Sequence, residues 1–180
     1  MIEFNKEIVE ALKELNCKAK KITTKENSII SVIQEDQDLG FVGIPRSINK
    51  DLLTETIKTN EVPVIAPLGL DKNNQTFNIN ADTAAGSIAI ELKARRLMII
   101  SDVEGVLDSK KKLIPEINSK KANELIDQDI ITGGMIPKIK NCLDVASNGV
   151  KGVVIIDGRK NHSLLFELLS DKGSGTLIRE

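Results

Sequence analysis

The chain has 180 residues, of which 41% are hydrophobic and 28% charged, as is typical of a folded globular protein rather than a disordered one. Its 25 basic and 26 acidic residues give a formal net charge of −1 without an arginine-rich stripe, which argues against a nucleic-acid partner. No stretch is apolar enough to span a bilayer and the start does not resemble a signal peptide, so we expect no membrane partner and a cytoplasmic location. One histidine and two isolated cysteines disfavour a transition-metal site.

The first half of the chain predicts two helices and several short strands. Asn5 is placed to cap an amphipathic helix that continues to residue 15. Ser47 or Asn49 is placed to cap a second helix that continues through Ile57. Four β-prone runs are separated by polar, turn-forming residues: 19–23, 28–33, 40–44 and 62–67.

The second half alternates helices and strands more regularly. Two strands are apolar without interruption, at 97–100 and 152–156, and a short run at 176–178 closes the chain. The predicted helices are about 82–94, one capped by Ser119, about 135–147 and one capped by Asn161. Continuous apolar strands between amphipathic helices are buried on both faces. The pattern therefore predicts an α/β fold with an open, mainly parallel sheet sandwiched by helices.

Three segments follow predicted strands or open a helix, at the edge where parallel sheets bind ligands. They are 101–107, 130–138 and 157–159. The Gly133-Gly134 turn offers backbone N–H groups and a helix N-terminus to an anion, and Lys138 would add a positive charge one turn later. From spacing alone a plain turn with an exposed lysine is favoured, because Gly-Gly turns are common.

A second polar cluster lies at residues 78–82. Alternation puts Asn78 and Asn80 on the same side of an extended stretch, and Asp82 begins the next helix. The simpler interpretation is that Asn80 is an N-cap and Asp82 complements the helix dipole. Capping does not explain the small residues at 81 and 83–86, which would let a ligand or another element pack closely.

Five motifs in this order resemble the N-acetylglutamate kinases of the amino-acid kinase superfamily. They are Asn78-Ile79-Asn80-Ala81-Asp82-Thr83-Ala84-Ala85-Gly86, Ser101-Asp102-Val103-Glu104-Gly105-Val106-Leu107-Asp108, Ile131-Thr132-Gly133-Gly134-Met135-Ile136-Pro137-Lys138, Ile155-Ile156-Asp157-Gly158-Arg159 and Gly173-Ser174-Gly175-Thr176. The similarity begins at Asn5 and covers essentially the whole chain. The resemblance implies that residues 1–95 are a remnant of the acceptor-substrate lobe and residues 96–180 the nucleotide-binding lobe.

The resemblance also implies a reaction. ATP, carried with Mg²⁺, would phosphorylate the γ-carboxylate of N-acetyl-L-glutamate to an acyl phosphate in arginine biosynthesis. Lys138 would stabilise the transferring phosphoryl group, and Asp82 would orient the active-site lysines. Asn78 would bind acetylglutamate, with Asn80 as a second contact. The implied nucleotide-binding residues are Asp102, Val103, Glu104, Gly105, Val106, Leu107, Ile130, Ile131, Thr132, Gly133 and Gly134.

Further partners follow from the same resemblance. We expect a homo-oligomer, a dimer or larger. An arginine effector would bind near the last helix and the 173–176 loop, with His162 and Glu167 as candidate contacts. For His162 alone, an ordinary surface histidine is the simpler interpretation.

Members of that family also carry a Lys-x-Gly-Gly loop, a His-Gly-Gly-Gly turn and an arginine that binds the substrate α-carboxylate, and this sequence contains none of the three. We therefore expect the chain to be the carboxy-terminal part of such a kinase, incomplete when alone. Two alternatives stay open: a kinase for an acetylated aminoadipate, and a non-catalytic remnant that binds a nucleotide or arginine.

Overall fold

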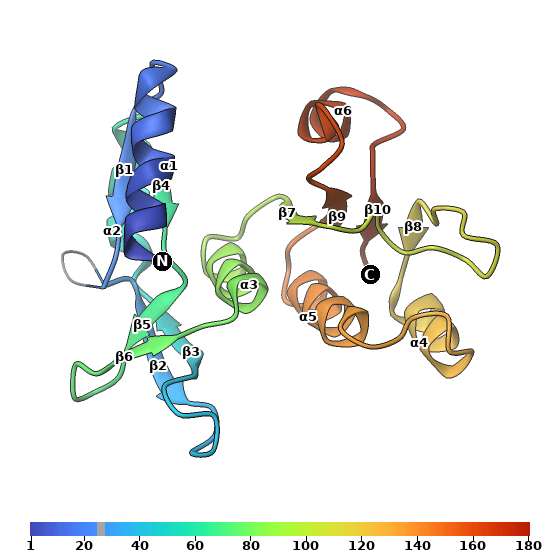
Figure 1. Ribbon diagram of the computed structural model, residues 1–180, viewed down its shortest axis with the longest axis horizontal. Coiled ribbons are helices and arrows are strands. Elements are labelled where there is room, and N and C mark those ends of the chain that lie inside the picture. Colours follow the sequence, from blue (N-terminus) through green and yellow to red (C-terminus); the bar gives the residue numbers. More distant parts are fainter. Residues whose placement is uncertain (25–27) are drawn as a thin grey trace. The chain divides into compact units, whose positions relative to one another are not determined.

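The computed structural model describes residues 1–24 and 28–180. The chain divides into two compact units, Met1–Glu91 and Leu92–Glu180; the first has two sheets and the second one sheet among the described residues, and each has its own helices (Figure 1). Among the helices of the described residues, none combines the length and the apolar character needed to cross a membrane.

The amino-terminal unit builds two sheets from its described residues. Its helices are α1 (Ile2–Glu14), α2 (Lys50–Lys58) and α3 (Ala81–Glu91). Its strands are β1 (Ala19–Ile22), β2 (Ile30–Gln34), β3 (Gly43–Ile48), β4 (Val62–Ile65), β5 (Leu68–Leu70) and β6 (Thr76–Asn78). Strands β1 and β4 pair in parallel, and α1 contacts both of them. The second sheet has the order β3-β2-β5-β6, with β2 and β5 parallel and the two outer pairs antiparallel.

Helix α1 begins earlier than the sequence predicted. The Asn5 backbone N–H already donates to the Met1 carbonyl at 2.9 Å, so Asn5 lies inside the helix and the predicted cap was wrong. The Asn5 side chain is buried, and its amide donates to the carbonyl of Val64 in β4 at 2.8 Å. The Asn5 side chain therefore binds a residue that is distant in the sequence instead of capping the helix.

Two antiparallel hairpins lead to the start of α3. Gly43 at the start of β3 packs on β6, where an added Cβ would lie only 2.9 Å from the Cβ of Phe77. The β5–β6 turn is closed by Asp71, whose carboxylate accepts the backbone N–H groups of Asn73 and Gln75 at 2.8 Å each. These contacts fix β6 and therefore the point at which α3 begins.

The carboxy-terminal unit is a four-stranded sheet with helices on its faces. Its helices are α4 (Ser119–Asp127), α5 (Met135–Ser147) and α6 (Ser163–Leu169). Its strands are β7 (Leu97–Ser101), β8 (Glu116–Ile117), β9 (Val153–Asp157) and β10 (Thr176–Ile178), in the order β7-β9-β10-β8. The pairs β7–β9 and β10–β8 are parallel, and β9–β10 is antiparallel. Figure 1 shows α6 on one side of this sheet and α4 and α5 on the other.

The two apolar strands differ in burial. Every residue of β9 is buried, as its continuous apolar sequence predicted. Strand β7 lies at the edge of the sheet, and its Ile100 side chain is 59% exposed, so the prediction of burial on both faces was wrong for β7. Whether another layer packs over each face of a strand depends on residues distant in the sequence, which a run of apolar residues does not reveal.

Helix ends were predicted less well than helix interiors. Asn118 caps α4 by accepting the Lys121 backbone N–H at 2.9 Å, in place of the predicted Ser119. Helix α6 begins after His162, which has a φ of 62°, in place of the predicted cap at Asn161. In both places neighbouring polar residues compete for one position, and the backbone angles decide between them.

The predicted α/β class is confirmed: among the described residues, mixed sheets with four parallel and three antiparallel strand pairs are flanked by helices. Antiparallel hairpins at β2–β3 and β5–β6 add to the parallel pairs.

Candidate functional site

Two of the predicted ligand-binding segments leave the sheet at the carboxyl ends of neighbouring strands. Strands β7 and β9 are parallel neighbours, and their last residues, Ser101 and Asp157, lie opposite each other. The Gly158 backbone N–H donates to the Ser101 carbonyl at 2.8 Å. A Cβ at position 158 would lie 2.5 Å from the Cγ2 of Ile100, which accounts for glycine there. The segments 102–108 and 158–160 are therefore joined at the carboxyl end of two parallel strands, where open sheets of this kind bind ligands.

The far end of the 102–107 loop is anchored on β10. The Val106 backbone N–H donates to the buried Thr176 Oγ1 at 2.8 Å, and the same hydroxyl donates to the Ile114 carbonyl at 2.7 Å. Gly105 is buried with a φ of +135°, and a Cβ there would lie 2.5 Å from the Thr176 Oγ1. The sequence placed Thr176 in a motif without indicating that it holds this loop.

Charged side chains of both signs lie close together at the carboxyl ends of β7 and β9. The Arg159 guanidinium donates to both carboxylate oxygens of the buried Asp157, at 2.9 Å from Nε and 3.0 Å from Nη2. Those side-chain hydrogen bonds, followed by one from the Arg159 backbone N–H at 2.9 Å, lower the pKa of Asp157 from 3.8 to about 2. The same hydrogen bond raises the pKa of Arg159, and the carboxylates of Asp102 and Glu104 add to the rise. Beside this pair, the Lys160 Nζ lies 3.0 Å from an Oε of Glu104.

The third segment forms the entry to α5. Ile130 and Ile131 both donate their backbone N–H groups to the Leu125 carbonyl, and Ile131 is buried beneath the turn. Gly133 has a φ of +54°, which favours glycine, and nothing lies within 4 Å of a Cβ built at position 133 or 134. The space over the Gly133-Gly134 turn is therefore open.

Lys138 lies in the first turn of α5 and is half-buried. The exposed Thr132 precedes the turn, and its carbonyl accepts the Met135 backbone N–H at 3.2 Å. The arrangement agrees with the predicted glycine turn opening a helix near a lysine.

The polar cluster at residues 78–82 lies in the other unit, at the junction of β6 and α3. Phe77 and Ile79 are buried, which leaves Asn78 and Asn80 on the exposed side as the alternation predicted. Asn80 Oδ1 accepts the backbone N–H of Asp82 at 3.0 Å and that of residue 83 at 3.2 Å. The capping interpretation of Asn80 is therefore correct, and its side-chain oxygen is engaged by the helix. Asp82 is half-buried in the first turn of α3.

The structure gathers two groups of predicted residues, and the segment 130–138 stands apart from both at the entry to α5. Asn78, Asn80 and Asp82 meet at the start of α3, and residues 102–107 meet the 157–160 turn. Asn78 and Asp82 belong to one unit and Lys138 to the other.

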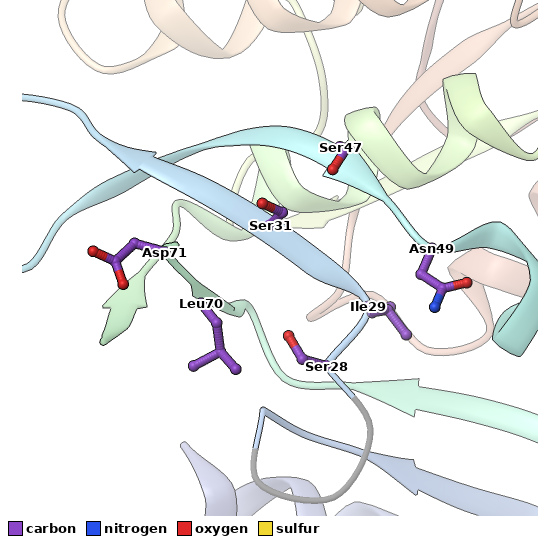
Figure 2. Close-up of a pocket in the computed structure, with 7 residues that line it drawn as sticks. All are labelled: Ser28, Ile29, Ser31, Ser47, Asn49, Leu70 and Asp71. Atoms are coloured by element: carbon purple, nitrogen blue, oxygen red, sulfur yellow. The ribbon is translucent and has the colours of Figure 1, made fainter. Parts of the chain in front are cut away.

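Three hollows lie outside these groups. One of about 230 Å³ in the amino-terminal unit has mostly small polar walls, shown in Figure 2: Ser28, Ile29, Ser31, Ser47, Asn49, Leu70 and Asp71. Glu167 and Gly173 line one of about 340 Å³ in the carboxy-terminal unit, whereas His162 lines another of about 370 Å³ with apolar residues of α6. The two candidate arginine contacts therefore face different hollows.

The profile of the Amino acid kinase family matches residues 1–157, and the chain belongs to this family. Within the family it is similar to acetylglutamate kinases. It is 86% identical over 180 residues to the acetylglutamate kinase of Pelagibacter ubique (strain HTCC1062), a match that covers 100% of this chain and 62% of the relative. It is 44% identical over 190 residues to that of Rhodopseudomonas palustris (strain BisB18), covering 98% of this chain and 64% of the relative. The resemblance inferred from the five motifs is thereby confirmed, and the chain spans less than two thirds of these relatives.

Solved structures show the same fold. The protein smu.665 from Streptococcus mutans UA159 superposes with a TM-score of 0.82 at 31% identity, covering 97% of this chain and 66% of that one. The N-acetylglutamate synthase from Neisseria gonorrhoeae, in its complex with coenzyme A and L-arginine, has a TM-score of 0.77 at 22% identity, covering 91% of this chain and 38% of that one. At that identity the second likeness concerns the fold alone.

Proposed function

We propose that this chain is part of an acetylglutamate kinase. Such an enzyme transfers the γ-phosphoryl group of ATP to the γ-carboxylate of N-acetyl-L-glutamate. The observation that carries the proposal is the 86% identity, over all 180 residues, to a protein named acetylglutamate kinase. The geometry supports it, because loops at the carboxyl ends of β7 and β9 form an edge suited to a nucleotide. The same identity favours this substrate over an acetylated aminoadipate and an enzyme over a non-catalytic remnant.

The chemistry needs positive charge more than a base. A γ-carboxylate is already ionised at neutral pH, so its attack on ATP requires no proton transfer. Catalysis depends on offsetting the repulsion between two anions and the charge that develops on the phosphoryl oxygens. Lys138 would supply that charge from the first turn of α5, and the open Gly133-Gly134 turn would let phosphate approach the backbone.

The nucleotide would lie along two loops of the carboxy-terminal unit. Residues 102–107 and 130–134 would wrap ATP, with Asp102 and Glu104 at the exposed surface of the first loop. Mg²⁺ would arrive on the phosphates as part of the nucleotide substrate, since this cation commonly keeps water ligands and binds substrate phosphates. Within residues 1–24 and 28–180, no group of three acidic, histidine or cysteine side chains is placed to hold a metal ion.

On the acceptor side, Asn78 would bind acetylglutamate and Asp82 would orient the catalytic lysines. Asn80 has a narrower role than the sequence suggested. Its Oδ1 already caps α3, so its amide NH₂ group is the part that would donate to a carboxylate or carbonyl of the substrate. Residues 1–95 would thus serve the acceptor and residues 96–180 the nucleotide.

We further infer an arginine effector site at the hollow of about 340 Å³ beside Glu167. The buried Glu167 carboxylate accepts the Ser174 backbone N–H at 2.9 Å and lies 3.5 Å from Arg96 Nη1, so it already engages a guanidinium. A free arginine would compete for the same carboxylate. Calorimetric titration with arginine tests this, and equal affinity in Glu167→Gln would contradict it.

We also propose that the protein forms a homo-oligomer. We further propose that it is located in the cytoplasm, where ATP is available.

Because the chain spans less than two thirds of its relatives, the test of the main function uses a complete kinase that contains it. The acyl phosphate is trapped with hydroxylamine in the presence of ATP, Mg²⁺ and N-acetyl-L-glutamate. We expect hydroxamate to form with this substrate in preference to N-acetyl-L-aminoadipate. Absence of ATP-dependent hydroxamate from both substrates would overturn the proposal.

In a complete kinase that contains this chain, Lys138→Met should lower kcat by about a hundredfold or more, because it removes charge stabilisation made in the transition state. Lys140→Met is the matched control, since Lys140 is an exposed lysine of the same helix and should leave kcat within about twofold. An unchanged kcat in Lys138→Met would remove Lys138 from the catalytic role.

A further inference from the structure

The loop that we assign to the nucleotide is held at three places. Its start is tied to the next strand by the Gly158 N–H bond to the Ser101 carbonyl. Its end is tied to β10 by the bond from the Val106 N–H to Thr176. Between these points, the side-chain contact of the loop with the 157–160 turn is the Glu104–Lys160 ion pair at 3.0 Å.

The turn that carries Lys160 is itself rigidly built. Asp157 is buried at the end of β9, and its carboxylate binds both the backbone N–H and the guanidinium of Arg159. A bidentate pair of this kind is directional and strong. The Lys160 backbone N–H also donates to the Asp157 carbonyl at 3.4 Å. Lys160 therefore extends toward Glu104 from a fixed base rather than from a loose loop.

The Glu104–Lys160 ion pair also changes the charge that a nucleotide would meet. Asp102, Glu104 and Asp157 place three carboxylates at an edge that must accept an anionic nucleotide, and Arg159 already engages Asp157. Lys160 offsets the charge of Glu104 in the same way. Removing the lysine would release the middle of the loop and leave a carboxylate to repel phosphate.

We propose that Lys160 is a positioning residue for the nucleotide: it holds Glu104, and so sets the conformation of residues 102–107 before the nucleotide arrives. The inference rests on the proposed ATP-binding role of that loop. It assigns to the 157–160 turn a task that neither the sequence motifs nor the family resemblance gave it.

The first experiment needs no nucleotide. Hydrogen–deuterium exchange of the full chain should become faster across residues 102–107 in Lys160→Met and in Glu104→Gln, with little change across α4. Lys121→Met is the matched control, because Lys121 forms an ion pair of similar exposure with Glu124 on α4, at 3.4 Å. Exchange in the loop that is unchanged in Lys160→Met would overturn the inference, whatever the protein binds.

The second experiment uses ATP with Mg²⁺ and measures its dissociation constant by calorimetry. An exposed ion pair is a modest contact, so we expect Lys160→Met to weaken binding by about threefold, with the thermal midpoint nearly unchanged. The exchanged pair Lys160→Glu with Glu104→Lys should restore both affinity and loop protection, which a general loss of structure would not allow. Failure of the exchanged pair to restore them would overturn the inference.

The two proposals fail in different ways. If a complete kinase that contains this chain bound no ATP while loop exchange still responded to Lys160→Met, the Glu104–Lys160 contact would stand and the proposed function would fall. If ATP bound equally well to the parent and to Lys160→Met, the positioning role would be refuted while the kinase assignment stood.

Discussion

Asp157 is the residue whose environment departs most clearly from that of an ordinary surface acid. The hydrogen bonds from Arg159 lower its pKa from 3.8 to about 2, so the folded protein releases this proton more readily than the unfolded chain. A group of this kind stabilises the fold above its unfolded pKa, and the contribution disappears as the pH falls from about 4 to about 2. Its effect is therefore complete at neutral pH.

We predict that Asp157→Asn lowers the thermal midpoint at pH 7 and flattens its decline between about pH 4 and pH 2, because the variant has lost the group responsible for part of that decline. Scanning calorimetry across this range checks it. Asp127→Asn is the control, since Asp127 is an exposed carboxylate at the end of α4. Parallel curves for the parent and Asp157→Asn would mean that the Arg159 contact adds nothing to stability.

Thr176 shows how one hydroxyl connects elements that lie far apart in the sequence. Its Oγ1 bridges the 102–107 loop and the approach to β8 through Val106 and Ile114, and the side chain is fully buried in β10. Replacing it with valine keeps the shape and leaves the buried Val106 N–H and the half-buried Ile114 carbonyl without this partner.

We predict that Thr176→Val lowers the free energy of unfolding by about 2 kcal/mol, the usual cost of unsatisfied buried polar groups. Thr176→Ser keeps the hydroxyl and should lose about 1 kcal/mol or less, for one missing methyl group. Urea denaturation of both variants measures the difference. Equal losses in the two variants would show that the methyl group, not the hydroxyl, holds the loop.

Most helices and strands followed from local sequence patterns, but β5 and β8 were not predicted and β3 begins later than the predicted run at 40–44. The features of packing that the patterns missed have a common cause. The start and end of α5 agree with the predicted range of about 135–147, because the apolar face of the helix and the Asn-Gly pair that follows it are local signals. The burial of Asn5, the exposure of Ile100 and the role of Thr176 all depend on neighbours distant in the sequence. A pattern along the chain carries little information about such neighbours.

In the candidate site, too, the features that depend on nearby residues were predicted and one contact between distant residues was missed. Each motif named the segment that lies at a strand end or helix start, because those positions follow from the order of the elements. The Glu104–Lys160 pair was missed, since it joins loops that follow different strands and both side chains look like ordinary surface charges in the sequence. The capping role of Asn80 was foreseen, because a cap acts within three residues.

At the scale of the whole molecule, one exposed apolar surface is prominent. Helix α6 has seven residues, and its five apolar side chains are exposed to between 39% and 81%: Leu164, Leu165, Phe166, Leu168 and Leu169. Monomeric proteins rarely expose a continuous apolar patch of this kind without a partner. The proposed homo-oligomer gives this surface a second copy of the chain as that partner.

We predict that the purified chain shows a concentration-dependent mass in sedimentation, because burial of α6 apolar side chains favours association. Leu165→Ser with Leu169→Ser should shift the equilibrium toward the single chain by removing the apolar area that two copies would bury. Ile57→Ser is the control, since Ile57 is an apolar side chain of α2 with a comparable exposure of 49%. The prediction would be contradicted by the mass of a single chain at every concentration, or by an association that the α6 substitutions leave intact. The latter outcome would locate the interface on another surface of the molecule.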